Sequence, residues 1–264
     1  MSASDHHAWF LRVAASSNKP MNSDMQSVEA TSVATFLQLV DTLDNRHLFR
    51  GQADSSWPVL PSLARKVNAL KLGAWNFDSW ETIESVLLQE FQRLSSPWLT
   101  LTPRNRLEWL VVVQHHGIPT MLLDRTTNPL KGLFFAVEDF SFDNADGVVF
   151  AFQHYAGWHN AIDRITTIED LMCFFPTHIN PRLVNQEACF VAFALPDKLK
   201  PFEPLTVFDE KRNDHNGWLD QVIIPRKAKA SLRGELAKLG ITHQSLFPGL
   251  DGIATTIRRS HGWQ

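Results

Sequence analysis

Cysteine and tyrosine are nearly missing from this chain of 264 residues, which has two cysteines and one tyrosine. Two cysteines cannot build the dense disulfide framework of a small secreted domain. The spacing of Cys173 and Cys189 also fits no zinc-binding motif. The pair suits a reducing compartment, so we expect a cytoplasmic protein.

Long apolar runs and a marked excess of one charge are also missing. No run of about 18 apolar residues occurs, so we expect no membrane span. The first twenty residues lack the basic start and apolar stretch of a secretory signal. The formal net charge is -3, which excludes a global basic field for nucleic acid but leaves a local basic groove open.

The common sequence motifs of enzymes are not found either. The chain has no phosphate-binding loop, no dinucleotide fingerprint, no H-E-x-x-H and no G-x-S-x-G. Its eleven histidines are scattered, and the adjacent His115 and His116 would point in different directions on a helix. We therefore expect no metal site.

What the chain does contain is enough apolar residues for a packed core. Hydrophobic residues make up 44% of the sequence and charged residues 20%. Residues 1–27 are polar and irregular, which predicts an N-terminal arm before one domain over 28–264. We expect an α+β fold, with a mixed central β-sheet and flanking helices.

Hydrophobic periodicity and turn residues place the expected elements. Helical spacing begins near Ser27, a candidate N-cap, and proline opens a later helix at Pro129. The stretch 154–180 reads as irregular with a short helix. Helices are predicted over 27–44, 79–95, 104–117, 129–140 and 229–241, and strands over 47–51, 118–127, 146–153, 187–195 and 220–226.

A dense polar cluster lies in the middle of the chain, where a predicted helix meets a predicted strand. Polar side chains at such a junction can converge on a cleft. Alternatively, the two histidines end a helix against its C-terminal dipole, and Asp124 caps the helix that begins at Pro129. The members are Gln114, His115, His116, Thr120, Asp124, Arg125, Thr126, Thr127 and Asn128.

Two smaller polar sites stand beside predicted strands. Arg50 ends a short apolar run and is followed by Gly51, which would let a ligand approach the backbone. Gln186 and Glu187 precede the predicted strand that ends at Leu195, although they could also belong to a solvated loop.

These stretches together resemble the FRG domain family, which is bacterial and phage-associated and is named for its aromatic-Arg-Gly motif. The matching segments are "FRGQ", "QHHGIPTMLLDRTTNPLKGLFFA", "RLVNQEACF" and "LFPGLDGIA", and the resemblance spans roughly residues 30–260. Three positions depart from the family pattern. Met121 stands where arginine is usual, Arg125 where tryptophan is usual, and Ala188 where glycine is usual.

A weaker resemblance is to ADP-ribosyltransferases of the Arg-Ser-Glu type, and it implies NAD as a co-substrate. In those enzymes a first strand carries the arginine that holds the dinucleotide, a later strand carries a Ser/Thr motif, and a third presents a glutamate. The resemblance implies binding roles for Arg50, Gly51, Gln114, His115, His116 and Thr120, and catalytic roles for Arg50, Asp124, Thr126, Gln186 and Glu187. Gln186 is a poor substitute for a carboxylate, so Glu187 or Asp124 could supply the charge.

Two functions stay open at this point. One is a toxin or anti-phage effector that transfers ADP-ribose to RNA, DNA or protein, with a neutralising protein partner. The other is a non-catalytic module that binds a nucleotide, a nucleic acid or a protein.

Overall fold

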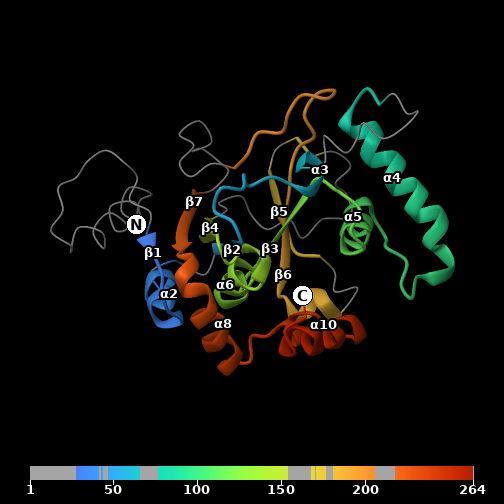
Figure 1. The fold of residues 1–264 in the computed structure, drawn as a ribbon. Coiled ribbons are helices and arrows are strands. Elements are labelled where there is room, and N and C mark those ends of the chain that lie inside the picture. Colours follow the sequence, from blue (N-terminus) through green and yellow to red (C-terminus); the bar gives the residue numbers. More distant parts are fainter. Residues whose placement is uncertain are drawn as a thin grey trace.

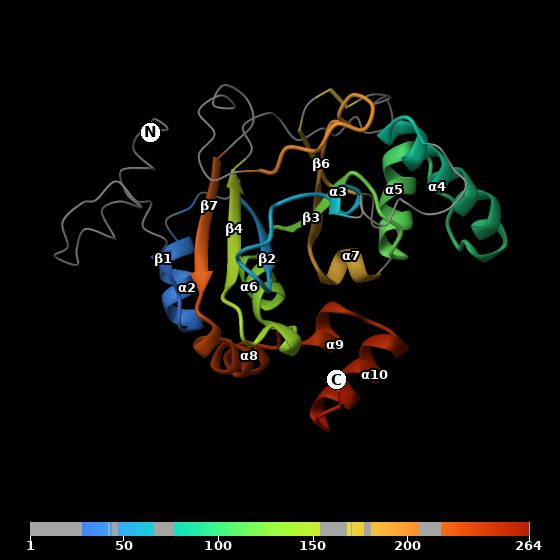
Figure 2. The same cartoon turned by 45° about the horizontal axis from the view of Figure 1, so that its top comes forward.

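The computed structural model describes residues 28–41, 43, 47–65, 77–153, 168–169, 171–176, 181–205 and 218–263. The predicted N-terminal arm lies outside these residues. The described part forms one mixed sheet of seven strands, in the order β1-β7-β4-β2-β3-β6-β5, with helices packed against it (Figures 1 and 2). This architecture confirms the predicted α+β class.

The strands follow the predicted positions, with two additions. They are β1 (Val28–Glu29), β2 (His47–Gln52), β3 (Leu122–Thr126), β4 (Gly147–Gln153), β5 (Met172–Phe174), β6 (Ala188–Ala192) and β7 (Trp218–Ile224). β1 lies where the first helix was expected to begin, and β5 lies in the stretch predicted to be irregular. β1 is only two residues long and β5 three, too short to show a period of their own.

Five helices match the prediction, whereas three short helices and the eleven-residue helix at 250–260 were not predicted. The helices are α2 (Val33–Val40), α3 (Ser62–Arg65), α4 (Trp80–Ser95), α5 (Arg106–His115), α6 (Pro129–Val137), α7 (Pro181–Asn185), α8 (Lys229–Lys238), α9 (His243–Leu246) and α10 (Leu250–Ser260). Residues 181–185 form the short helix α7, and Gln186 and Glu187 follow it in the turn to β6.

The structure corrects two N-caps that were predicted from the sequence. Ser32, not Ser27, is the N-cap of α2, because its side chain accepts a hydrogen bond from the amide of Thr35. Asn128, not Asp124, caps α6, since its side-chain oxygen accepts from the amide of Leu130 at 3.0 Å. Asp124 is therefore left for another role.

Helices cover both faces of the sheet. One core packs α2, α6 and α8 against one face, with Phe49, Val149 and Ile224 among the strand residues buried there. A second core covers the opposite face and includes Leu48 and Phe150 with residues of α3 and α4. A third cluster seats α5 against β3, β5 and β6.

The sheet opens between β2 and β3. β2 pairs with β4 at six positions, but with β3 at one position only, where Phe49 lies opposite Thr126. Past this pair each strand presents an arginine, Arg50 on β2 and Arg125 on β3. The opening lies beside α6, whose backbone approaches Gly51 so closely that a Cβ atom there would lie 2.0 Å from the Gly132 carbonyl oxygen.

A buried ion pair supports the turn that leads into β3. Glu84 of α4 is 1% exposed and accepts hydrogen bonds from Arg106 at 2.7 Å and from the amide of Met121 at 2.9 Å. Burial raises the pKa of Glu84, and the charge of Arg106 opposes that rise.

We expect Glu84→Ala to lower the free energy of unfolding by about 3–5 kcal/mol, because it leaves the guanidinium of Arg106 and a buried amide without their acceptor. Urea unfolding measures this. Glu90→Ala on the same helix removes only an exposed pair with Arg93 and should cost less than about 1 kcal/mol. Equal losses in the two variants would contradict the structural role of Glu84.

Candidate functional site

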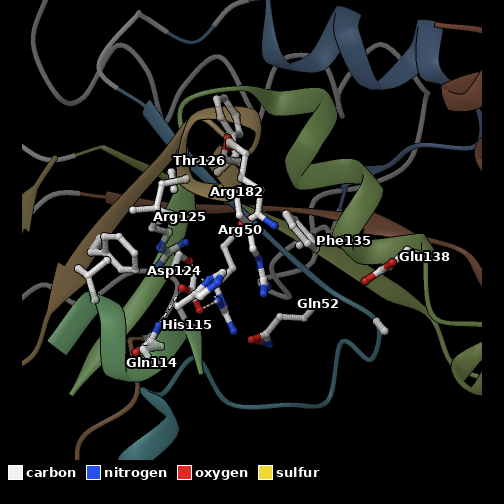
Figure 3. A pocket seen from close by; sticks show the side chains of 18 of the residues that line it. Arg50, Gln52, Gln114, His115, Asp124, Arg125, Thr126, Phe135, Glu138 and Arg182 are labelled. Atoms are coloured by element: carbon white, nitrogen blue, oxygen red, sulfur yellow. Dashed lines mark hydrogen bonds and ion pairs between the residues drawn. The ribbon is translucent and has the colours of Figure 1, made fainter. Parts of the chain in front are cut away.

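A cavity of about 320 Å³ opens where β2 and β3 part. β2, β3, α5, the C-terminal end of α6 and α7 all contribute to its walls (Figure 3). The lining residues are Phe49, Arg50, Gly51, Gln52, Ala53, Trp57, Arg65, Val111, Gln114, His115, Asp124, Arg125, Thr126, Phe135, Glu138, Asp139, Arg182, Leu183, Gln186, Ala188 and Phe190.

Arg50 reaches across the opening from β2 to β3. Its Nη1 donates a hydrogen bond to the backbone carbonyl of Asp124 at 3.0 Å and lies 3.9 Å from the Asp124 carboxylate. The Nε of Arg50 is buried and has no hydrogen-bond partner among the described residues. Burial lowers the pKa of Arg50 to about 10, with Asp124 opposing the shift. The strands predicted over 47–51 and 118–127 are thus neighbours in the sheet.

Asp124 presents an exposed carboxylate that is held from behind. Gln114 Nε2 donates to Asp124 Oδ1 at 2.7 Å, and the hydroxyl of Thr120 donates to the other end of the same amide, Oε1. Thr120 is fully buried and does not line the cavity. It was predicted to bind the ligand, but its contact with the site runs through Gln114, so it acts as a positioning residue.

The rings of His115 and His116 lie edge to face, with centroids 5.0 Å apart, but they border different hollows. His115 lines the cavity, whereas His116 stacks on Phe91 with ring centroids 5.7 Å apart and faces a different hollow. Burial lowers the pKa of His115, and the positive charges of Arg182 and His116 lower it further. Of this predicted pair, the structure brings only His115 to the site.

Thr126 and Gln186 line the cavity but are occupied by local hydrogen bonds. The Thr126 hydroxyl donates to the Gln186 carbonyl at 2.7 Å and accepts from the amide of Asn128 at 3.1 Å. The side chain of Gln186 donates to the carbonyl of Leu246 in α9 at 3.3 Å. These contacts tie β3, α6, α7 and α9 together at the cavity wall.

Glu187 turns away from the cavity. It has a φ of +46°, in the left-handed region, and does not line the cavity. Lys131 donates to its carboxylate at 2.7 Å and Asn128 at 3.2 Å. Burial alone would raise the pKa of Glu187, but these hydrogen bonds outweigh it and hold that pKa below its usual value. Asp124 is thus the predicted carboxylate that the structure places in the cavity.

Several lining residues were given no binding or catalytic role from the sequence. Arg65, Arg125 and Arg182 join Arg50, so four arginines line one cavity. The carboxylates Glu138 and Asp139 follow the C-terminal end of α6, where the helix dipole disfavours negative charge. This unfavourable position is the feature of the sequence that could have marked them as site residues. Arg65 is the last residue of α3, a helix of four residues that no sequence pattern predicted.

The cavity combines cationic and aromatic walls. Trp57, which lies edge-on to Phe142, and Phe135, whose ring contacts Phe247, both line the cavity. Arginine side chains favour phosphates or carboxylates, and aromatic faces favour flat rings. The site is therefore suited to a ligand with negative charge and a planar ring system, and nucleotides have both.

The fold and this cavity describe an α+β domain with an arginine-rich ligand pocket. Residues 45–145 match the family model of the FRG domain, which supports the resemblance to that family over this segment. The matched segment contains β2, β3 and α6, and hence Arg50, Asp124 and Arg125. Comparisons with curated proteins and with solved structures found no match.

Two further properties concern the described residues only. No group of three or more His, Cys, Asp or Glu side chains there could hold a metal ion, and no helix there has the length and apolar character that crossing a bilayer requires. Both cysteines are buried free thiols.

Proposed function

We propose that the cavity binds NAD and uses it as a donor of ADP-ribose. The observation that carries this proposal is the placement of Arg50, at the opening between β2 and β3, beside the exposed and braced carboxylate of Asp124. A guanidinium that holds a pyrophosphate, with a carboxylate next to it, is what cleavage of the nicotinamide–ribose bond needs.

The binding half of the proposal rests on charge and shape. Arg50 is kept in place by its bond to the β3 backbone, so it presents a fixed fork to a phosphate. Trp57 and Phe135 offer ring surfaces. The cavity is at the lower end of the usual volume of ligand pockets, about 300–1,000 Å³, so it would hold part of a dinucleotide and leave the rest toward the acceptor.

The chemical half concerns one bond broken and one formed. The bond between ribose C1′ and the nicotinamide nitrogen breaks, and nicotinamide leaves as a neutral molecule with the electron pair. Positive charge develops on the ribose, where the Asp124 carboxylate stabilises it. An acceptor oxygen or nitrogen then bonds to C1′ and gives up its proton to water. Water as the acceptor makes the reaction a hydrolysis, and RNA, DNA or protein makes it a transfer.

A second function is favoured by the position of Glu187. Its carboxylate is paired with Lys131 and lies outside the cavity, so the third element of the Arg-Ser-Glu pattern does not reach the ligand site. A module that keeps the arginine pocket and binds a nucleotide without cleaving it accounts for this arrangement. In the first function the protein would act as a toxin or anti-phage effector with a neutralising partner. In the second it would act as a nucleotide sensor.

The two functions are separated by incubating the protein with labelled NAD, candidate acceptors and water alone, beside the Arg50→Ala variant. We expect nicotinamide release or label transfer by the wild type and a loss of about ten- to a hundredfold in Arg50→Ala, because a charged hydrogen bond is worth about 1.5–3 kcal/mol. No release by the wild type contradicts the enzyme. A thermal shift with NAD that disappears in Arg50→Ala then supports the sensor.

A further inference from the structure

The most unusual side chain of the cavity is Arg125 of β3. Its side chain is buried, with 3% of the residue exposed, and none of its three nitrogens has a hydrogen-bond partner among the described residues. Buried arginine is normally paired or hydrogen-bonded, because an unpaired buried charge and unsatisfied N–H groups both oppose folding. A guanidinium without hydrogen-bond partners on a cavity wall points to a ligand that accepts its hydrogen bonds.

The residues around Arg125 do not neutralise it. It lies over the ring of Phe152 at 5.4 Å, and Cys189 is its partner in the β3–β6 pairing. Burial raises the pKa of Cys173 to about 12 and that of Cys189 well above its usual value, so both thiols stay neutral. Burial, together with the charge of Arg50, lowers the pKa of Arg125 itself to about 9.

Arg50 also lacks a hydrogen-bond partner among the described residues at one of its nitrogens. The Nε of Arg50 is buried without a partner, and its charge and that of Arg65 repel each other. The carboxylate nearest to this group is Asp124, which is exposed and also accepts from Gln114. The positive charges of Arg50, Arg65 and Arg125 thus outnumber the one carboxylate that approaches Arg50, that of Asp124.

The other two carboxylates of the cavity accept hydrogen bonds from other groups. Glu138 accepts from Arg259 at 3.0 Å and lies 3.0 Å from the imidazole Nδ1 of His243. Asp139 accepts from the amide of Ser141 at 3.1 Å at the start of the next turn. Neither forms a hydrogen bond with Arg125, so its guanidinium remains for the ligand.

We propose that Arg50 and Arg125 form a two-guanidinium site that holds the adjacent phosphates of a pyrophosphate-bridged nucleotide, one phosphate on each arginine. The two residues follow the single β2–β3 pair in register, so they stand on either side of the opening. A pyrophosphate diester brings two negative charges on neighbouring groups, one for each of the two guanidinium groups. The inference rests on the proposed function for the location of the ligand, but not on cleavage of NAD.

Arg125→Met tests this in the full-length protein. Methionine fills a similar apolar volume without charge, so we expect the unliganded variant to melt at the same temperature as the wild type or higher. Calorimetry with ADP-ribose should show binding weakened about ten- to a hundredfold, as expected for a lost charged hydrogen-bond pair. A variant that melts lower and binds ADP-ribose like the wild type assigns Arg125 a structural role and overturns the proposal.

The ligand class is tested with a series of probes on the wild type. ADP-ribose should bind at least about tenfold more tightly than AMP, and inorganic pyrophosphate should compete with it. In Arg125→Met the preference for ADP-ribose over AMP should disappear. Equal affinity for AMP and ADP-ribose in the wild type would assign the site to a single terminal phosphate and overturn the pyrophosphate assignment.

Two more variants complete the design. Arg93→Met removes an exposed arginine of α4 that does not line the cavity, and it should change neither readout. Arg125→Lys keeps the charge but loses the fork, so it should bind ADP-ribose weakly even if the methionine variant does not fold. Arg125-dependent ADP-ribose binding without nicotinamide release would refute the enzyme and leave this inference standing. NAD cleavage with unchanged ADP-ribose affinity in both Arg125 variants would refute this inference and leave the enzyme standing.

Discussion

Gly51→Ala is expected to lower the free energy of unfolding by about 3 kcal/mol or more, or to prevent folding. The added Cβ would lie 2.0 Å from the carbonyl oxygen of Gly132 and 2.5 Å from the amide nitrogen of Ala136. Both atoms belong to the backbone of α6, so no side-chain rotation relieves the overlap. Overpacking of a tight core costs about 1–3 kcal/mol even where side chains can adjust.

The same close approach explains why the substitution should also remove ligand binding. α6 packs against β2 through Phe49 and Gly51 on one face, while Arg50 between them reaches toward β3. A helix pushed away from β2 would shift Arg50 and the cavity wall at Phe135 together. Any folded Gly51→Ala protein should therefore show little thermal shift with NAD.

Gly234→Ala is the matched control. Gly234 lies within α8 and an added Cβ there meets nothing within 4 Å. Alanine favours a helix interior by about 1 kcal/mol over glycine, so this variant should be slightly more stable than the wild type. Guanidinium unfolding of both variants compares them directly. If Gly51→Ala unfolds at the wild-type midpoint, β2 and α6 are not in the contact described.

Most long elements of this fold, α10 excepted, were predictable because local signals agreed with the tertiary structure. α4 shows helical periodicity and begins where Ser79 accepts from the amide of Thr82. β4 is a run of apolar residues in the middle of the sheet. In such segments the positions that are apolar in the sequence are the positions that are buried in the fold.

The short elements depend on contacts made far along the chain, so the sequence could not specify them. α7 has five residues and α9 four, below the length at which a helix is stable by itself. They are joined by hydrogen bonds from Asn185 and Gln186 to carbonyls of α9. Such pairings appear only once the chain is folded.

The site was predictable in part for the same reason. Arg50, Gln114, His115 and Asp124 were predicted site residues, and all four line the cavity. The unsatisfied state of Arg125 could not be inferred, since it depends on which side chains of β5 and β6 surround it. The orientation of Glu187 could not be inferred either, because its left-handed backbone and its pairing with Lys131 arise from the α7–β6 turn.

Of the two candidate carboxylates for the ribose, Asp124 lines the cavity and Glu187 does not. If NAD is consumed, we expect Asp124→Asn to lower the rate of nicotinamide release by about a hundred- to a thousandfold, as for loss of a group that stabilises charge in the transition state. Asparagine keeps an oxygen for the hydrogen bond from Gln114 and has the same size. The affinity for ADP-ribose should therefore stay within a few-fold of the wild type.

Glu187→Gln is the matched comparison, because it removes one carboxylate charge in the same region. Its pairing with Lys131 lies outside the cavity, so we expect a modest loss of thermal stability and less than about a threefold change in rate. Single-turnover release of nicotinamide separates the chemical step from binding in both variants. A large rate loss in Glu187→Gln with a nearly normal Asp124→Asn would mean that α7 and the following turn rearrange when NAD binds and carry Glu187 into the cavity. Asp124 would then serve to hold Arg50 in place, through the 3.9 Å approach of their charged groups.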